Sequence, residues 1–78
     1  MKYKSIKEEK FSKIYQDYSD DVYRICVYLV KDKKLALEVM QQTFVDFYEF
    51  FENVAPESML SYLINIATNL VRSHQKNS

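Results

Sequence analysis

The sequence predicts an all-α fold, specifically a small antiparallel three-helix bundle. The chain has 78 residues with no glycine and one proline, so long open loops are not expected. Apolar residues recur at three- and four-residue steps in three segments, and short polar breaks separate these segments. Short connections favour antiparallel neighbours, and a chain of this length is expected to form one domain.

The first predicted helix follows a lysine-rich start. Ser5 and Glu8 form a capping-box pattern, but residues 1–10 are equally consistent with a basic extension that frays. Residues 11–78 are expected to form the helical domain. Ser19-Asp20-Asp21 are poor helix formers, which leaves room for a bend or a break in the first helix. The apolar stripe of this helix comprises Phe11, Ile14, Tyr15, Tyr18, Val22, Ile25, Cys26 and Leu29.

The second predicted helix runs from Leu35 to about Phe51, with Asp32 as a plausible N-cap. Its predicted core face comprises Leu35, Val39, Met40, Thr43, Phe47 and Phe50. Its other face carries carboxylates, amides and one apolar side chain, namely Glu38, Gln41, Gln42, Val45 and Glu49. Residues 35–58 contain five acids and no base. This distribution favours a partner with a basic surface, and the alternative interpretation is a simple solvated face.

The second break spans Asn53 to Ser58. Asn53 is suited to end the second helix, and Pro56 to open the first turn of the third. The apolar face of the third helix comprises Leu60, Leu63, Ile64, Ala67, Leu70 and Val71.

The composition argues against several classes of function. Cys26 is the single cysteine and His74 the single histidine, so neither a disulfide framework nor a structural zinc site is expected. Cys26 lies on an apolar stripe, which favours a buried structural residue over a reactive thiol. A chain without glycine cannot form a glycine-rich phosphate loop, and it offers no nucleophile–base pair, so we expect no enzyme activity and no cofactor.

The net charge is zero, so a global basic signal for nucleic acid is absent. The sequence contains neither the apolar run of a signal peptide nor a segment long and apolar enough to span a bilayer. We therefore expect a cytoplasmic protein with no membrane partner, which also suits its single cysteine.

Three motifs together resemble region 2 of the sigma-70 family, especially its extracytoplasmic-function group. Residues 36–48, ALEVMQQTFVDFY, are similar to the pattern A-E-D-L-V-Q-E-T-F-L-R-x-[WY]. Residues 11–18, FSKIYQDY, resemble F-x-x-[IL]-Y-x-x-[YF], and residues 62–70, YLINIATNL, resemble W-L-Y-R-I-A-R-N-L. The three motifs occur in the family's order with family-like spacing, and the resemblance spans the chain from Phe11 to Lys76.

The resemblance implies a module for transcription initiation that binds the β′ subunit of the RNA polymerase core. By position, Glu38, Gln41 and Gln42 stand at polar residues of the polymerase-binding motif. The acidic, amide-bearing face with Val45 and Glu49 suits a basic coiled coil on independent physical grounds, because charge steers association and an apolar centre supplies affinity.

The resemblance also implies that the third helix and the loop before it contact the promoter −10 element and help to melt it. Tyr62 stands at the family's Trp, and Asn69 matches its Asn. Asn65 and Thr68 stand where the family prefers Arg, which removes phosphate contacts. Candidate DNA-binding residues are therefore Tyr62, Asn65, Asn69, Arg72, His74 and Lys76. For the basic members of this set, a solvated helix end is the alternative.

The sequence ends shortly after the region 2 motifs. It is therefore expected to be either a fragment or the small co-sigma subunit of a two-subunit sigma factor, in which a separate sigma protein supplies region 4. We favour the second interpretation. The alternative function is a protein-interaction module that occupies polymerase or a sigma partner without contacting DNA, as an inhibitor or decoy.

Overall fold

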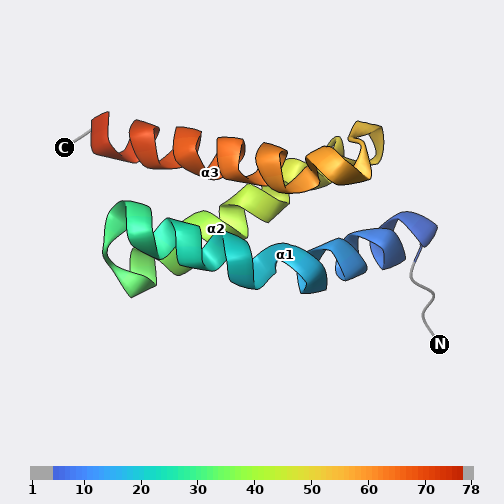
Figure 1. The fold of residues 1–78 in the computed structure, drawn as a ribbon, viewed down its shortest axis with the longest axis horizontal. Coiled ribbons are helices and arrows are strands. Elements are labelled where there is room, and N and C mark those ends of the chain that lie inside the picture. Colours follow the sequence, from blue (N-terminus) through green and yellow to red (C-terminus); the bar gives the residue numbers. More distant parts are fainter. Residues whose placement is uncertain (1–4, 77–78) are drawn as a thin grey trace.

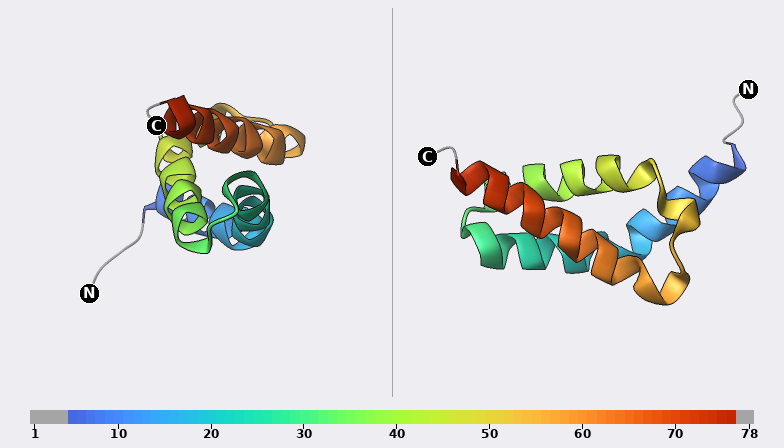
Figure 2. Two further views of the ribbon diagram at one scale, coloured as in Figure 1. Left: turned by 90° about the vertical axis from the view of Figure 1, so that its left-hand side faces the viewer. Right: turned by 90° about the horizontal axis from the view of Figure 1, so that it is seen from above.

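The fold is all-α in the part of the chain that the structure describes, as the sequence predicts. The computed structural model describes the backbone of residues 5–76 and the side chains of residues 5–74. Its helices are α1 (Ile6–Val30), α2 (Lys33–Tyr48) and α3 (Met59–Lys76), with short 3₁₀ turns η1 (Phe51–Asn53) and η2 (Pro56–Ser58) between the last two. The chain runs along α1, returns along α2 and runs back along α3 (Figure 1). Seen from the end, the three helices occupy the corners of a triangle (Figure 2).

The start of α1 has the capping box that the sequence predicts. The Ser5 hydroxyl accepts a hydrogen bond from the Glu8 backbone N–H at 3.1 Å, and the Glu8 carboxylate accepts one from the Ser5 N–H at 3.1 Å. Residues 5–10 thus include the cap and first turns of α1, while residues 1–4 lie outside the described part. The helix continues through Ser19-Asp20-Asp21 without a break, and an ion pair between Asp21 and Arg24 one turn later supports it there.

The turn between α1 and α2 joins two well-formed caps. Lys31 ends α1 in the left-handed conformation, with φ 58° and ψ 32°, and donates its backbone N–H to the Val27 carbonyl. Asp32 is the N-cap of α2, as predicted, because its carboxylate accepts a hydrogen bond from the Leu35 N–H at 3.1 Å. The helix itself begins at Lys33, two residues earlier than the apolar pattern predicts.

The predicted end of the second helix at Phe51 is wrong. Regular helix stops at Tyr48, and Phe50 leaves the helical region with φ −143° and ψ 11°. The chain then turns through η1, which places the Phe51 ring in the core with 2% of its surface exposed. Burial of this ring favours the turn over further helix.

The predicted role of Asn53 needs the same correction, whereas Pro56 opens a helical turn as predicted. Asn53 closes η1, and Glu49 is the C-cap of α2. Pro56 opens η2, where its fixed φ is tolerated, and α3 starts three residues later at Met59.

The core contains residues from all three helices and from the connection between α2 and α3. Its buried apolar residues are Val22, Cys26, Ala36, Val39, Met40, Phe44, Phe47, Phe51, Val54, Leu63, Ala67 and Val71. Among the side chains of residues 5–74, Thr43 is the one buried polar group, and its hydroxyl donates to the Val39 carbonyl at 2.7 Å, so it is satisfied. Burial raises the pKa of the Cys26 thiol, which agrees with a structural residue.

The predicted core face of α2 is too narrow. Val39, Met40, Thr43 and Phe47 are buried as expected, whereas Leu35 and Phe50 are half-buried. Ala36 and Phe44 are also buried and were missed. The reason is topological: α2 packs against both α1 and α3, so it buries a wider arc than a helix with one neighbour.

Candidate interaction faces

The predicted polymerase-binding residues share one exposed face of α2. Glu38, Gln41, Gln42, Val45 and Glu49 are all exposed and follow one another at steps of one, three and four residues. Such spacing keeps them within about a third of the helix circumference. Val45 lies at the centre of this face with 61% of its surface exposed, and it adjoins the aromatic residues of a neighbouring groove.

A hydrogen bond fixes part of this face. The Gln42 side-chain amide donates to the Asp46 carboxylate at 2.8 Å, one turn further along α2. This bond holds both side chains along the helix. The Gln42 amide is therefore presented in one orientation and not as a freely rotating group.

A shallow groove of about 360 Å³ runs beside the face, between α2 and α1. Its floor is aromatic: the Tyr15 and Phe44 rings meet edge to face at 4.8 Å between centroids, and Phe11 meets Tyr48 at 5.0 Å. Gln41, Val45 and Glu49 form its rim on the α2 side. Phe44 and Tyr48 are not among the residues predicted for this surface. The one signal for them in the sequence is the aromatic pair Phe11 and Tyr15 in the apolar stripe of the first helix, which needs aromatic partners on a neighbouring helix.

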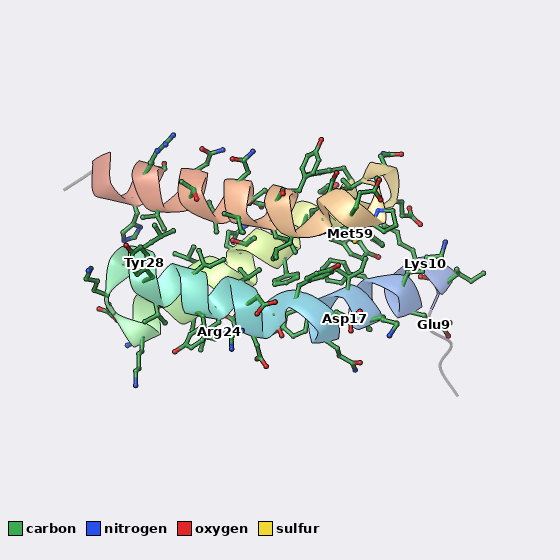
Figure 3. All side chains as sticks on the ribbon, viewed as in Figure 1. Glu9, Lys10, Asp17, Arg24, Tyr28 and Met59 are labelled. Carbon is green, nitrogen blue, oxygen red and sulfur yellow. The ribbon has the colours of Figure 1, made fainter. Side chains whose placement is uncertain are left out.

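Most predicted DNA-binding residues share the outer face of α3. Tyr62, Asn65, Asn69 and Arg72 are exposed and succeed one another at steps of three, four and three residues, and Lys76 follows four residues later at the helix end. Side chains on this side of α3 point away from the other two helices (Figure 3). The Lys76 side chain itself lies outside the described part of the chain.

Tyr62 presents its ring only in part. Its ring packs edge to face on Phe50 at 5.8 Å between centroids, and 45% of its surface remains exposed. The contact gives the ring a fixed position and leaves area for a further stacking partner.

The structure does not bring His74 to the same face. It follows Val71 by three residues and Ala67 by seven, so it lies on the side of the buried residues, although it is exposed. Thr68, which stands at an Arg position of the family pattern, is half-buried.

The loop from Asn53 to Ser58 is anchored at one point. Val54 is buried, while Asn53, Ala55, Pro56 and Glu57 are exposed. Next to the loop lies a hollow of about 490 Å³ against α1, lined by Lys10, Lys13, Ile14, Asp17, Tyr18, Phe51, Glu52, Val54, Pro56 and Met59. The hollow faces α1, and the exposed face of α3 does not contribute to it.

The described residues contain neither a candidate metal site nor a candidate membrane-spanning helix. No cluster of His, Cys, Asp or Glu within residues 5–76 could hold a metal ion. None of the helices in that range combines the length and the apolar character that a membrane crossing requires.

Comparison with known proteins places the chain in a family. Residues 14–78 match the model of sigma-70 region 2. The chain is 36% identical over 67 residues to the ECF RNA polymerase sigma factor SigM of Bacillus subtilis (strain 168), an alignment that covers 81% of this chain and 41% of that protein. The chain therefore spans less than half the length of this curated relative. No solved structure matches. With its three helices and the three motifs in order, the chain belongs to the sigma-70 region 2 family and is similar to the extracytoplasmic-function type.

Proposed function

We propose that the protein acts in transcription initiation as a sigma region 2 module that binds the β′ subunit of RNA polymerase through the outer face of α2. The observation that carries this proposal is the single exposed face formed by Glu38, Gln41, Gln42, Val45 and Glu49. An apolar residue exposed at the centre of a polar face is typical of a protein interface.

The chemistry of the face fits a basic helical partner. Glu38 and Glu49 stand near its two ends and would steer a basic surface into place. Val45 and the exposed parts of Tyr15 and Tyr48 would supply the apolar contact area in the middle, over the buried Phe44 ring. The groove between α1 and α2 has room for side chains that project from a partner helix.

A capture assay tests the polymerase contact. Tagged protein should retain core RNA polymerase, and the variant Gln41→Ala should retain clearly less, because it removes a polar group on the rim of the groove. Gln16→Ala is the matched control, since Gln16 is an exposed glutamine on α1 outside the proposed face. Helical content by circular dichroism should be the same in all three proteins. Equal capture by both variants would contradict the proposed face.

We further propose that the outer face of α3 contributes to recognition and melting of the promoter −10 element. The exposed part of the Tyr62 ring suits stacking with an unpaired base, and Arg72 suits a phosphate contact. Asn65 and Asn69 can hydrogen-bond to base edges or phosphates. Because Asn65 and Thr68 are neutral, binding of DNA by this face alone should be weak.

The proposal includes a separate sigma protein that supplies region 4, so that this chain is the small subunit of a two-subunit factor. Weak DNA binding by one subunit fits this arrangement, because two linked modules share the task through effective concentration. The test is transcription in vitro with core polymerase, this protein and a sigma protein that carries region 4. Open promoter complexes that require both proteins would support the proposal.

The neutral residues in α3 favour one alternative, an inhibitor or decoy that occupies polymerase or a sigma partner without touching DNA. The same transcription assay separates the two functions. Suppression of transcription without open complexes, at any ratio of the two proteins, would favour the decoy. Loss of open complexes in Tyr62→Ala, with polymerase capture unchanged, would exclude it.

A further inference from the structure

The turn between α1 and α2 carries a concentration of positive charge that the proposed function leaves unused. Lys31, Lys33 and Lys34 are exposed, and Tyr28 beside them has 75% of its surface exposed. The Lys31 ammonium lies 5.6 Å from the centroid of the Tyr28 ring. We call these four residues the basic end.

The charge of the basic end is not neutralised within the described part of the chain. Lys33 and Lys34 take part in neither of the ion pairs found among residues 5–74. Asp32 stands between the lysines and caps α2 with its carboxylate, so Lys31, Asp32, Lys33 and Lys34 together carry a net charge of +2. The nearest acid on the exposed side of α2 is Glu38, one turn beyond Lys34.

The lysines occupy positions that are unfavourable for folding. The first turn of α2 has two lysines and no acid, although the positive end of the helix dipole favours carboxylates there. Lys31 has the left-handed conformation in which glycine would be less strained. Helix electrostatics therefore do not account for Lys33 and Lys34, although a positive charge at Lys31 suits the C-terminus of α1.

The basic end lies at the same end of the bundle as the last turns of α3. Because the chain runs up, down and up, the C-termini of α1 and α3 and the N-terminus of α2 share one end of the bundle (Figures 1 and 2). Tyr28 marks this end, and Glu9 and Lys10 mark the opposite end (Figure 3). Arg72 lies in the last turns of α3, at the same end as the lysines.

We infer that the basic end binds the phosphate backbone of duplex DNA and so forms a second DNA contact, separate from the outer face of α3. Phosphate binding requires exposed point charges without a deep pocket, which is what three lysines around one aromatic ring provide. The contact would replace charge that Asn65 and Thr68 do not supply in α3. The inference rests on the proposed DNA-binding function and deepens it.

A pair of charge-matched variants tests the inference. Lys33→Gln/Lys34→Gln removes two charges from the basic end, and Lys10→Gln/Lys13→Gln removes two from the opposite half of α1. Both keep the helical structure and lower the net charge equally. Binding of each protein to a short duplex is followed by amide chemical shifts over a series of salt concentrations.

For the native protein we expect shifts of the amides in residues 28–34 on addition of duplex DNA. Lys33→Gln/Lys34→Gln should bind DNA about tenfold more weakly. The slope of the logarithm of the binding constant against the logarithm of the salt concentration should also be shallower by roughly 1.8, because each lost phosphate contact contributes about 0.9. Lys10→Gln/Lys13→Gln should keep the native slope.

Three outcomes would overturn the inference. The first is the absence of shifts in residues 28–34 at the lowest salt. The second is an equal loss in both variants, which would mean that only net charge matters. The third is polyglutamate binding at this end as strongly as DNA, which would assign the surface to an acidic protein.

Polymerase capture separates failure of the inference from failure of the proposed function. Lys33 lies off the face of Glu38, Gln41, Gln42, Val45 and Glu49, whereas Lys34 continues that face one turn before Glu38. The capture comparison therefore uses Lys33→Gln and Lys10→Gln/Lys13→Gln, which should both retain polymerase as the native protein does. If the native protein captures polymerase and Lys33→Gln/Lys34→Gln binds DNA as the native protein does, the DNA contact of the basic end is refuted and the proposed function is not. Loss of capture by the native protein would refute the proposed function instead.

Discussion

Lys31 shows how one residue can join two helices without glycine. Its backbone has φ 58°, and its N–H closes the end of α1 on the Val27 carbonyl at 2.7 Å. A side chain with a Cβ atom pays a steric penalty in this conformation, which glycine avoids. The tight two-residue connection to α2 therefore depends on a strained position that the capping bonds hold in place.

Replacing Lys31 with glycine should stabilise the protein. Removal of the Cβ atom should raise the free energy of unfolding by about 1 kcal/mol. Urea denaturation followed by circular dichroism measures the change. Lys31→Ala is the control, since it removes the charge and keeps the Cβ atom, and it should bring no comparable gain. An equal gain in both variants would instead assign the effect to repulsion among the lysines.

At the scale of the element, α2 combines three surfaces on one helix. One arc packs against α1 and α3, the opposite arc carries Val45 and the acidic and amide side chains, and the first turn carries Lys33 and Lys34. Asp32 fixes where the helix begins, and the turn at Phe51 fixes where it ends. The helix therefore has little freedom to shift its register relative to its neighbours.

The first turn of α2 should be open to stabilisation by charge reversal. Lys33→Glu places a carboxylate at the positive end of the helix dipole and should raise the free energy of unfolding by roughly 0.5–1 kcal/mol at low salt. Lys10→Glu, beyond the first turn of α1, is the matched control and should have a smaller effect. Thermal denaturation at low and high salt measures both. A gain that persists at high salt would contradict the electrostatic explanation.

Sequence patterns predicted the caps of these helices better than their packing. Ser5, Glu8 and Asp32 were identified correctly because a cap depends on residues within one turn of each other. Phe51 was placed in the helix, and Phe44 was left out of the core, because both depend on neighbours distant in sequence. Phe44 is buried against rings of α1, and a single-stripe argument cannot supply that second neighbour.

The candidate faces were also partly predictable. Spacing alone placed the five residues of the α2 face together, and likewise Tyr62, Asn65, Asn69 and Arg72 on α3. It did not distinguish His74, whose type suits a DNA contact but whose position turns it toward the side of Val71 and Ala67. The aromatic groove beside Val45 required the relative placement of α1 and α2, which no local pattern contains.

At the scale of the whole molecule, stability depends on one aromatic-rich core without covalent support. For 78 residues the expected free energy of unfolding is roughly 4–12 kcal/mol. Phe51 contributes to the core from a short 3₁₀ turn and lies 5.3 Å from Phe11 and 6.2 Å from Phe47 between ring centroids. It thus ties the connection between α2 and α3 to both α1 and α2.

Truncation of this ring should therefore threaten the fold as a whole. Phe51→Ala should lower the free energy of unfolding by about 3–5 kcal/mol, through lost burial and the cavity that remains. Tyr28→Ala is the control, because Tyr28 is an aromatic residue with 75% of its surface exposed, and it should cost less than about 1 kcal/mol. Calorimetry compares the two. If Phe51→Ala and Tyr28→Ala melted at similar temperatures, η1 would have to relax and fill the cavity left by the Phe51 ring.

The outer faces of α2 and α3 lie on different corners of the triangle that the helices form. A protein seated on α2 and a nucleic acid seated on α3 would therefore occupy separate surfaces of the bundle. Neither ligand would have to leave before the other arrives. If both proposed contacts form, a complex of all three components would be reached by either order of addition, and the relative concentrations of the two ligands would decide the route.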